Sequence, residues 1–399
     1  MPKIHKNTCP ALFLDATIDP AGSYSPCTAL GGSAYNFSTD SVKTIWLHSE
    51  LEDARTRSAN GEKLSMCSRC WVEEEVGLIS HRQRHIENLT TDIDYTDKQY
   101  YFSGPTHLNI KVSNICNLRC RTCQSSDSYL YHIEGAYYEK THNLTDTIYT
   151  KEKFKKHFID SQIDELFELS GKLECIELYG GEPFLDSQIP KLLNRLIDTG
   201  ASRKIDLKIS TNATHTLTDQ WKKILTNFKQ VTINISIDGI GDKFTYLRHP
   251  GIWSNADKNI RALFILAMTN PCLTIIPVIT VSALNVWDVP EVFTYFTRYR
   301  TEPYLILVQT PSYYCVNILP PGIKDLVKIK LDQYNNKFDS ITNLMYTNVT
   351  TSSIRCHNNK MDSWDDFKFW TKEKDKYRNE SFLDTFSEFG QLLIDHKEW

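Results

Sequence analysis

The sequence predicts an α/β protein whose central part is a partial (β/α)6 TIM-like barrel. Between about residues 105 and 310, strand-like runs alternate with amphipathic helical stretches, as in parallel strands joined by crossover helices. Six such units fit a partly closed barrel better than a doubly wound sheet, although periodicity alone does not separate the two. We therefore divide the chain into a small cysteine-rich α+β domain (1–100), the barrel (101–310) and a helical C-terminal tail that covers it (311–399).

The six strands are predicted from short runs rich in aliphatic and β-branched residues. They are 106–113, 173–179, 204–210, 231–237, 273–281 and 304–310. After the second run, Ile189, Leu192, Leu193 and Leu196 recur at helical spacing, and Gly200 marks the end of that helix. In either architecture ligands bind at the carboxyl ends of the strands, so the residues that follow each strand are the candidate site.

Composition narrows the classes of function. The chain has 399 residues, 41% of them hydrophobic, and a formal net charge of -4, so no overall basic excess directs it to nucleic acid or to an anionic membrane. The longest apolar run, 262–268, is far shorter than a bilayer span of about twenty residues. The first residues lack the apolar core of a signal peptide. We expect a soluble, cytoplasmic protein whose eleven cysteines are reduced and serve metal binding or catalysis more than disulfides.

Three cysteines follow the first strand directly, in the stretch "SNICNLRCRTCQSS". Cys116, Cys120 and Cys123 supply three thiolates and no fourth. Three thiolates can hold three irons of a [4Fe-4S] cube and leave the fourth iron open to a ligand. The alternatives are a zinc site completed by a distant residue, or buried free thiols.

The second strand runs into "ELYGGEPF". Gly180 and Gly181 carry no side chain where the backbone leaves the strand, which would let a ligand approach the main chain closely. Glu182 then places a carboxylate at the rim, suited to an ammonium group. A plain turn between strand and helix is the alternative for this motif.

The third and fourth strands end in "STNAT" and "SIDG". They place Ser210, Asn212 and Ser236 at the same rim, whereas Asp238 also suits an ordinary Asp-Gly turn. Arg248, in "YLRHPGIW", could pair with a ligand carboxylate or stay solvated.

This ordered set of motifs resembles the radical S-adenosylmethionine (radical SAM) superfamily over residues 105–310. The resemblance implies a [4Fe-4S] cluster on the three cysteines, with the amino and carboxylate groups of SAM on the open iron. It also implies reductive cleavage of SAM to a 5′-deoxyadenosyl radical that abstracts hydrogen from a substrate. By the same resemblance the amino group binds Glu182, the carboxylate binds Ser236 and Arg248, and the ribose lies near Ser210 and Asn212. Members often carry an aromatic residue before the third cysteine, and this chain has Thr122.

The first hundred residues hold a second set of cysteines. Cys9 and Cys27 flank a predicted strand, "DPAG" turn and strand, which would bring the two thiols together. Cys67 and Cys70 stand just ahead of a helix whose predicted apolar face is formed by Val72, Val76, Ile79 and Ile86. Four thiolates fill a second [4Fe-4S] cluster or a structural zinc site. The pattern is similar to the SPASM and twitch auxiliary-cluster domains, which usually follow the barrel and here precede it.

Other features receive structural interpretations. We expect Cys175, Cys272, Cys315 and Cys356 to be core residues, although Cys356-His357 could bind metal. Tyrosines between residues 124 and 150 suit a substrate lid or a core edge equally. Ser363 and Asp366 predict a capped helix that packs Trp364, Phe367 and Trp370 inward. The tyrosines between residues 124 and 150 are Tyr129, Tyr131, Tyr137 and Tyr138.

Three functions remain open. The first is a radical SAM enzyme that acts on a peptide or protein side chain, and the second is one that acts on a sugar, nucleotide or cofactor precursor. The third is a non-catalytic Fe-S or zinc protein, which the rim motifs oppose because a structural site needs no SAM pocket. The resemblance also implies an electron donor such as a flavodoxin or ferredoxin.

Overall fold

The computed structural model describes most of the chain. The described residues are 5–28, 35–36, 41–75, 79–87, 95, 101–102, 104–142, 156–308, 310–335, 337–346 and 363–399. The interpretations of Val76, Cys356 and His357 concern positions outside these ranges.

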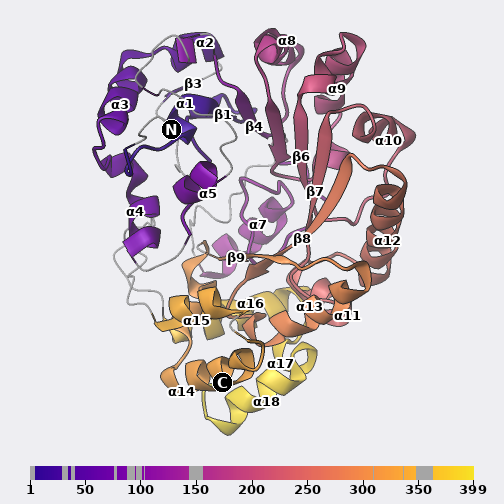
Figure 1. The fold of residues 1–399 in the computed structure, drawn as a ribbon. Coiled ribbons are helices and arrows are strands. Elements are labelled where there is room, and N and C mark those ends of the chain that lie inside the picture. Colours follow the sequence, from indigo (N-terminus) through magenta and orange to yellow (C-terminus); the bar gives the residue numbers. More distant parts are fainter. Residues whose placement is uncertain are drawn as a thin grey trace.

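A single sheet organises the molecule (Figure 1). In the described ranges its strands follow the order β3-β2-β1-β4-β5-β6-β7-β8-β9. The strands are β1 (Asp15–Ile18), β2 (Ser23–Ser25), β3 (Tyr35–Asn36), β4 (His107–Lys111), β5 (Cys175–Tyr179), β6 (Asp206–Thr211), β7 (Gln230–Ser236), β8 (Leu273–Val281) and β9 (Tyr304–Leu307). All neighbours from β4 to β9 are parallel, so the six predicted strands are confirmed. Their order follows the chain order, whereas a doubly wound sheet reverses direction midway.

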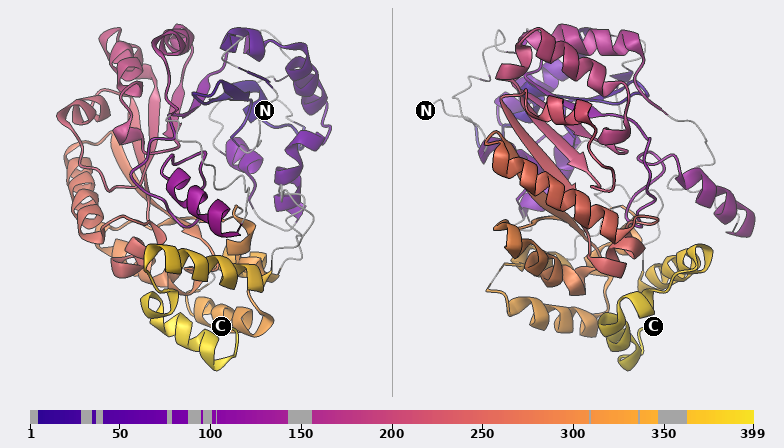
Figure 2. Two further views of the ribbon diagram at one scale, coloured as in Figure 1. Left: turned by 180° about the vertical axis from the view of Figure 1, so that it is seen from behind. Right: turned by 90° about the vertical axis from the view of Figure 1, so that its right-hand side faces the viewer.

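The two faces of the parallel sheet differ in polarity. One face is covered by helices α9, α10 and α12 (Figure 2) and buries aliphatic side chains such as Ile110 and Ile209. The opposite face carries a polar row across neighbouring strands, because Asn109, Glu177 and Lys208 are register partners. A polar inner face adjoining the strand ends is suited to ligands more than to core packing.

Helices follow most strands, and several boundaries were predictable. The helices are α1 (Ala11–Leu14), α2 (Val42–Trp46), α3 (Ser49–Ala59), α4 (Ser68–Glu75), α5 (His81–Glu87), α7 (Tyr131–His142), α8 (Asp160–Glu168), α9 (Ile189–Asp198), α10 (Asp219–Leu225), α11 (Gly241–Leu247), α12 (Trp253–Thr269), α13 (Val289–Phe296), α14 (Pro321–Asp332), α15 (Asp339–Tyr346), α16 (Trp364–Arg378), α17 (Phe382–Thr385) and α18 (Ser387–Asp395). The Asp186 carboxylate accepts the amide hydrogens of Gln188 and Ile189 at the start of α9, and Gly200 has φ 75° beyond its end.

The N-terminal region joins the same sheet. Strand β1 pairs in parallel with β4, while β2 pairs antiparallel with β1. The predicted turn between two strands is present, but Ala11–Leu14 just after Cys9 form a short helix.

The predicted helix after Cys70 was too long. It ends at Glu75, and Ile79 lies between two helices with 56% of its surface exposed, so Ile79 is not part of an apolar helix face.

The last helices, α14 to α18, gather at the lower end of the molecule in Figure 1. The capped helix predicted after Ser363 is confirmed, since Ser363 and Asp366 form a capping box and Phe367 is fully buried. None of the helices in the described ranges is both long and apolar enough to cross a membrane.

Candidate functional site

The three clustered cysteines lie in one loop beyond the carboxyl end of β4. The amide of Cys123 donates to the carbonyl of Cys120 at 3.0 Å, and the amide of Leu118 donates to the Cys116 sulfur at 3.4 Å. Burial, reinforced by the neighbouring Cys120, raises the pKa of the Cys116 thiol to about 12. Burial likewise raises the pKa values of Cys120 and Cys123. Thiols in such an environment ionise only with a strong cationic partner, such as the iron of a cluster.

Two predicted rim residues contact these sulfurs directly. The side-chain amide of Asn212, just beyond β6, lies 3.8 Å from the sulfur of Cys116. A guanidinium nitrogen of Arg248, Nη1, lies 3.9 Å from the sulfur of Cys120. Three segments far apart in the sequence therefore meet at one point, as the rule about strand ends predicts.

Arg248 is held by Asp238 and keeps one donor available. Its Nη2 lies 2.9 Å from Oδ2 of Asp238, whose Oδ1 accepts the amide hydrogen of Thr280 at 2.8 Å. Arg248 is 7% exposed, and its Nε has no hydrogen-bond partner within the described part of the chain. A buried guanidinium donor beside Cys120 fits a ligand carboxylate, which is the group that SAM would present there.

Glu182 lies deeper than a rim residue. It is fully buried, and it accepts hydrogen bonds from the amide of Asn212 at 2.8 Å, the hydroxyl of Thr211 at 2.8 Å and the amide of Phe184 at 3.2 Å. Burial raises the pKa of its carboxyl group to about 7, against the opposing effect of these donors. In this geometry the carboxylate joins the end of β6 to the GGEP turn.

The two glycines before Glu182 make room for protein atoms. A Cβ on Gly181, whose φ is +57°, would lie 2.5 Å from the carbonyl oxygen of Ile115, next to Cys116. A Cβ on Gly180, with φ +76°, would lie 2.4 Å from Cγ of Lys111. The amide of Glu182 also donates to the carbonyl of Ile115 at 2.8 Å. The GGEP turn therefore packs directly against the backbone of the cysteine loop, in addition to any contact with a ligand.

Ser210 and Ser236 lie where predicted. Ser210 is the penultimate residue of β6, and Ser236 is the final residue of β7. Both are half-buried on the polar face of the sheet, in register with Asn234 and Val278 respectively.

The four N-terminal cysteines line one small cavity. Cys9, Cys27, Cys67 and Cys70 come from three separate segments, and His81 of α5 lies among them. The sulfur of Cys27 is 3.5 Å from Nδ1 of His81. Burial, with a further contribution from His85, lowers the pKa of His81 to about 3, so its imidazole is neutral. Four thiols that line one cavity form a donor set of the kind and number that an iron-sulfur cluster takes.

The described cysteines are all free thiols, and they differ in burial. The ten cysteines of the described ranges are free thiols, and no three His, Cys, Asp or Glu side chains there converge closely enough to hold a single ion. Cys175 and Cys315 are buried, and the thiol of Cys315 donates to the carbonyl of Val308 at 3.1 Å, in line with a core role. Cys272 lies just before β8 and is partly exposed, so the core interpretation does not hold for it.

The tyrosine segment after the cysteine loop forms helix α7 and packs against α16. Tyr131 and Tyr138 are fully buried, and Tyr138 meets Trp370 edge to face with ring centroids 5.6 Å apart. In the described part of this segment, the core-edge interpretation therefore fits better than a lid.

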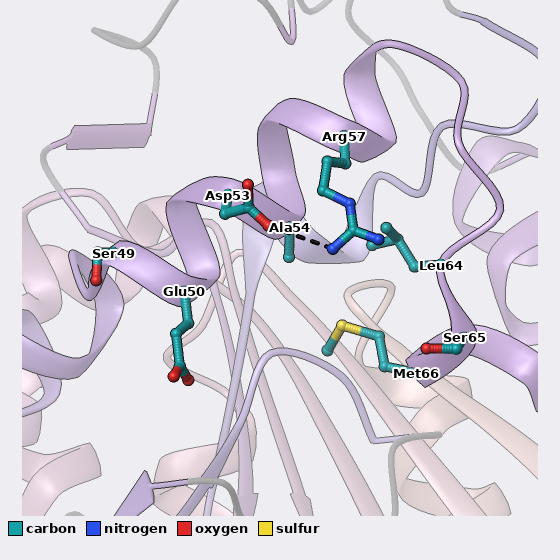
Figure 3. Close-up of a pocket in the computed structure, with 8 residues that line it drawn as sticks. All are labelled: Ser49, Glu50, Asp53, Ala54, Arg57, Leu64, Ser65 and Met66. Atoms are coloured by element: carbon teal, nitrogen blue, oxygen red, sulfur yellow. Dashed lines mark hydrogen bonds and ion pairs between the residues drawn. The ribbon is translucent and has the colours of Figure 1, made fainter.

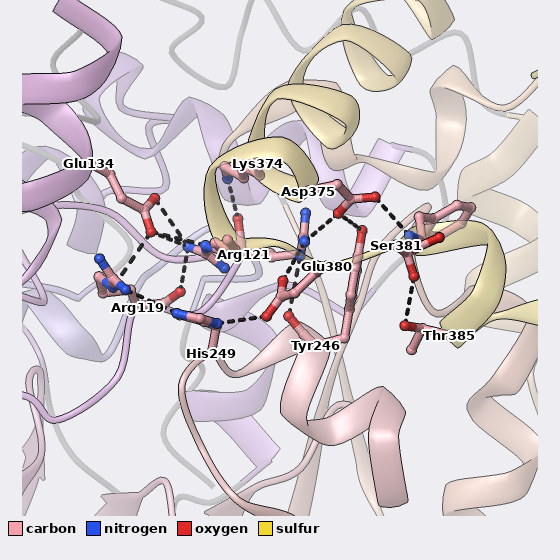
Figure 4. Close-up of polar contacts among 12 residues, drawn as sticks. Arg119, Arg121, Glu134, Tyr246, His249, Lys374, Asp375, Glu380, Ser381 and Thr385 are labelled. Atoms are coloured by element: carbon pink, nitrogen blue, oxygen red, sulfur yellow. Dashed lines mark hydrogen bonds and ion pairs between the residues drawn. The ribbon is translucent and has the colours of Figure 1, made fainter.

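Sequence reasoning missed a buried set of charges around Cys120 (Figure 4). Arg121 pairs with Asp375 at 2.5 Å and with Glu380 at 2.7 Å, and Arg378 pairs with Glu134 at 2.8 Å. The available signal was the arginine on each side of Cys120, Arg119 and Arg121, in a loop where charged residues would need buried partners.

A surface groove adjoins the cavity of the four N-terminal cysteines, since Met66 lines both. It has a volume of about 490 Å³ between α3 and the segment before Cys67, and it includes the Asp53–Arg57 ion pair (Figure 3). None of the predicted site residues lines it.

Comparisons with known proteins agree with these two sites. Residues 110–293 match the family model described as the Radical SAM superfamily, and residues 9–71 match that of the SPASM iron-sulfur cluster-binding domain. The first match covers the cysteine loop and all rim residues, and the second covers the four N-terminal cysteines. Among curated proteins, none matches the chain.

Several solved structures are similar at low identity. Native anSMEcpe with bound AdoMet is 18% identical, with a TM-score of 0.42, over 59% of this chain and 62% of that one. Streptococcus suis SuiB bound to precursor peptide SuiA is 14% identical, with a TM-score of 0.40, over 84% of this chain and 70% of SuiB. The methyltransferase TsrM from Kitasatospora setae, with tryptophan and a SAM analogue bound, is 11% identical, with a TM-score of 0.36. The match covers 53% of this chain and 37% of TsrM. The match thus spans less than two thirds of the length of anSMEcpe.

The family matches identify two domain types in the chain. Residues 110–293 match a radical SAM domain, and residues 9–71 match an iron-sulfur cluster-binding SPASM domain. These two domain matches agree with the domain types that the sequence resembles.

Proposed function

We propose that this chain cleaves SAM reductively at a [4Fe-4S] cluster held by Cys116, Cys120 and Cys123 and uses the resulting radical on a peptide or protein side chain. The observation that carries the proposal is the meeting of Asn212 and Arg248 with two of the three sulfurs, at 3.8 and 3.9 Å. When bound, the cluster and SAM together supply a 5′-deoxyadenosyl radical that abstracts hydrogen from the substrate. A purely structural metal site would not need a buried, unsatisfied guanidinium donor beside it.

The residues of the site have distinct roles in this proposal. Arg248 binds the SAM carboxylate through Nε, and Asp238 keeps the guanidinium in place. Ser236 extends the carboxylate site, while Ser210 and Asn212 lie toward the ribose. Glu182 orders the cysteine loop and the Asn212 amide through its hydrogen bonds. Its carboxylate would also accept a hydrogen bond from the SAM amino group when SAM contacts it.

The N-terminal region provides the auxiliary site. We assign Cys9, Cys27, Cys67 and Cys70 to a second [4Fe-4S] cluster in a domain that precedes the radical SAM domain, which we describe as a partial barrel of β4 to β9. Support comes from the single cavity that the four cysteines share and from the match at residues 9–71. The parallel pairing of β1 with β4 would keep this domain fixed against the barrel. Structural zinc is the alternative.

The substrate class rests on the combination of the two domains. The chain resembles radical SAM enzymes with SPASM-type domains, and many of those enzymes modify peptides. This resemblance favours a peptide or protein side chain as the substrate. A small sugar, nucleotide or cofactor precursor is the second candidate, because the polar row of Asn109, Glu177 and Lys208 would also suit a small polar molecule. We further propose a flavodoxin or ferredoxin as electron donor and the cytoplasm as the location.

The test is anaerobic incubation of the full chain with SAM, a reductant and deuterated candidate substrates, followed by mass spectrometry. Deuterium that moves from a peptide side chain into 5′-deoxyadenosine supports the proposal. Transfer only from a sugar, nucleotide or other metabolite would show the second candidate to be correct. Absence of 5′-deoxyadenosine from iron-loaded protein under every condition would refute SAM cleavage itself.

A further inference from the structure

The backbone around Cys120 is fixed from outside the loop by the end of the chain. The carbonyls of Arg119, Cys120 and Arg121 are consecutive, and each accepts a hydrogen bond from a buried side chain. The donors are Arg378 Nη2 at 2.8 Å, the Tyr131 hydroxyl and Lys374 Nζ at 3.1 Å, respectively. Two of these donors belong to α16, and the third belongs to α7.

The amides of the same stretch are engaged on the other side. Arg119 N donates to the carbonyl of His249 at 2.6 Å, and Arg121 N donates to that of Leu247 at 2.8 Å. These acceptors flank Arg248, the residue that contacts the Cys120 sulfur. The position of the Cys120 sulfur relative to Arg248 is therefore set by hydrogen bonds on both sides of the loop.

The layer around this loop is rich in buried ionisable groups. Arg119, Arg121 and Arg378 are three guanidinium groups beside the carboxylates of Glu134, Asp375 and Glu380. Burial, reinforced by Arg378, lowers the pKa of Lys374 well below its usual value, so Lys374 acts here as a hydrogen-bond donor and not as a full positive charge. The side chains of Arg121, Arg378 and Glu134 are 0% exposed, and Lys374 is fully buried. Charges in such a water-poor layer act on their neighbours with little screening.

We propose that α16 is a functional part of the SAM-cluster site, in which Tyr131, Lys374 and Arg378 act as positioning residues for Cys120. They turn three carbonyl dipoles toward α7 and α16, and Arg378 also places a guanidinium charge beside the loop. Both effects favour the reduced, more negative state of a cluster bound there, because hydrogen bonds and nearby charge set cluster potentials. The inference rests on the proposed function, since it assigns the cluster to the three cysteines of this loop.

Two variants test it with little change in shape. Tyr131→Phe removes only the hydroxyl that donates to Cys120, and Lys374→Met removes the donor to Arg121 while keeping a long side chain. The matched controls are Tyr377→Phe and Lys376→Met on α16, because Tyr377 is half-buried against Tyr137 and Lys376 is exposed. Each protein is loaded with iron and sulfide anaerobically, and the signal that responds to added SAM identifies the cluster of interest.

We expect both variants to hold iron as the wild type does, but with a more negative midpoint potential and an altered electron paramagnetic resonance spectrum of the reduced cluster. At a fixed reductant concentration, formation of 5′-deoxyadenosine should fall about tenfold, the effect typical of residues that orient metal ligands. The two controls should match the wild type in potential, spectrum and rate.

An unchanged potential and spectrum in both variants, at full iron content, would overturn the inference and leave α16 a structural cover. If Lys374→Met fails to fold, the result of Tyr131→Phe decides the matter alone, because its ring still fills the same space. Wild-type protein that forms no 5′-deoxyadenosine would refute the proposed function, whereas active wild type with indistinguishable variants refutes only this inference.

Discussion

Arg248 lies with one guanidinium nitrogen 3.9 Å from the sulfur of Cys120, although 128 residues separate the two in the chain. The same guanidinium is paired with Asp238 at 2.9 Å and retains a buried Nε that finds no acceptor within the described residues. Arg248 thus keeps a buried donor close to the cysteine loop, in keeping with the proposed binding of the SAM carboxylate there.

We expect Arg248→Gln to weaken SAM binding by about ten- to a hundredfold, because a charge-assisted hydrogen bond contributes about 1.5 to 3 kcal/mol. Iron content should stay intact, since Arg248 is not a ligand of the cluster. Equilibrium binding of SAM to the loaded protein measures the effect. Arg261→Gln, which breaks an exposed ion pair with Asp257, is the control and should bind SAM normally. Wild-type affinity in Arg248→Gln would contradict this role.

Gly181→Ala should displace the cysteine loop. The new Cβ would lie 2.5 Å from the Ile115 carbonyl oxygen and 2.9 Å from that of Ser113, and both are backbone atoms that cannot rotate away. We expect loss of about four of eight irons, with the auxiliary site still filled. Iron analysis and loss of the SAM-responsive spectral signal provide the measurement.

Gly200→Ala is the matched control for this change. Gly200 also has positive φ, +75°, but a Cβ there would meet nothing within 4 Å. It should therefore show only the strain of a left-handed alanine, about 1 to 2 kcal/mol, at full iron content. Equal iron loss in both variants would show that backbone strain, and not contact with the loop, is responsible.

The parts of the fold that were predicted depend on local signals. The strands from β4 to β9 follow from runs of aliphatic residues, and the start of α16 follows from the capping residues Ser363 and Asp366. The meeting of Asn212 with Cys116 also follows, because parallel strands end at the same edge of a sheet.

The parts that were missed depend on long-range contacts. Strand β1 was predicted as part of a hairpin, but its pairing with β4 was missed, because its own sequence does not reveal a partner some ninety positions later. Charges in "DDFKFWTKEKDKYR" look like a solvated helix face, yet Asp375 meets Arg121 from 254 residues away. Burial of Glu182 was hidden for the same reason, since its donors Thr211 and Asn212 belong to another strand end.

Metal analysis separates the two cysteine sites. Anaerobically purified protein should contain about eight irons and eight sulfides per chain if both sites hold [4Fe-4S] clusters. Cys120→Ala should abolish formation of 5′-deoxyadenosine, because it removes a ligand of the open cluster, whereas Cys27→Ala should lose iron only from the auxiliary site. Zinc bound at the four N-terminal cysteines, with about four irons elsewhere, would overturn the auxiliary cluster. Retained 5′-deoxyadenosine formation by Cys120→Ala would refute the central assignment.

Asp15 on β1 should make stability depend on pH. Its carboxyl group is 1% exposed, contacts Asn109 at 3.2 Å and His85 at 3.3 Å, and faces His107, Glu177 and Lys208. Burial raises its pKa to about 8, above the 3.8 of the unfolded chain, and burial lowers the pKa values of His85 and His107 to about 4. Between pH 6.5 and 8 both histidines are therefore neutral, while Asp15 is protonated when folded and ionised when unfolded.

The folded state thus binds the extra proton at Asp15, so the contribution of Asp15 to the free energy of unfolding should fall as pH rises through this window, by about 1 kcal/mol per pH unit. His85 and His107 contribute in the opposite direction near pH 6.5, because the unfolded chain protonates them and the folded chain does not, so the Asp15 effect is measured as the difference between the wild type and Asp15→Asn. Asp15→Asn, which keeps the shape of the side chain without a titrating group, should lose this slope and gain relative stability toward pH 8. Urea unfolding of metal-free, reduced protein at pH 6.5, 7.25 and 8 measures it, with Asp198→Asn on the exposed end of α9 as control. Parallel pH profiles for Asp15→Asn and the wild type would mean that Asp15 is ionised in the folded protein, stabilised by Asn109 and Lys208 against the effect of burial.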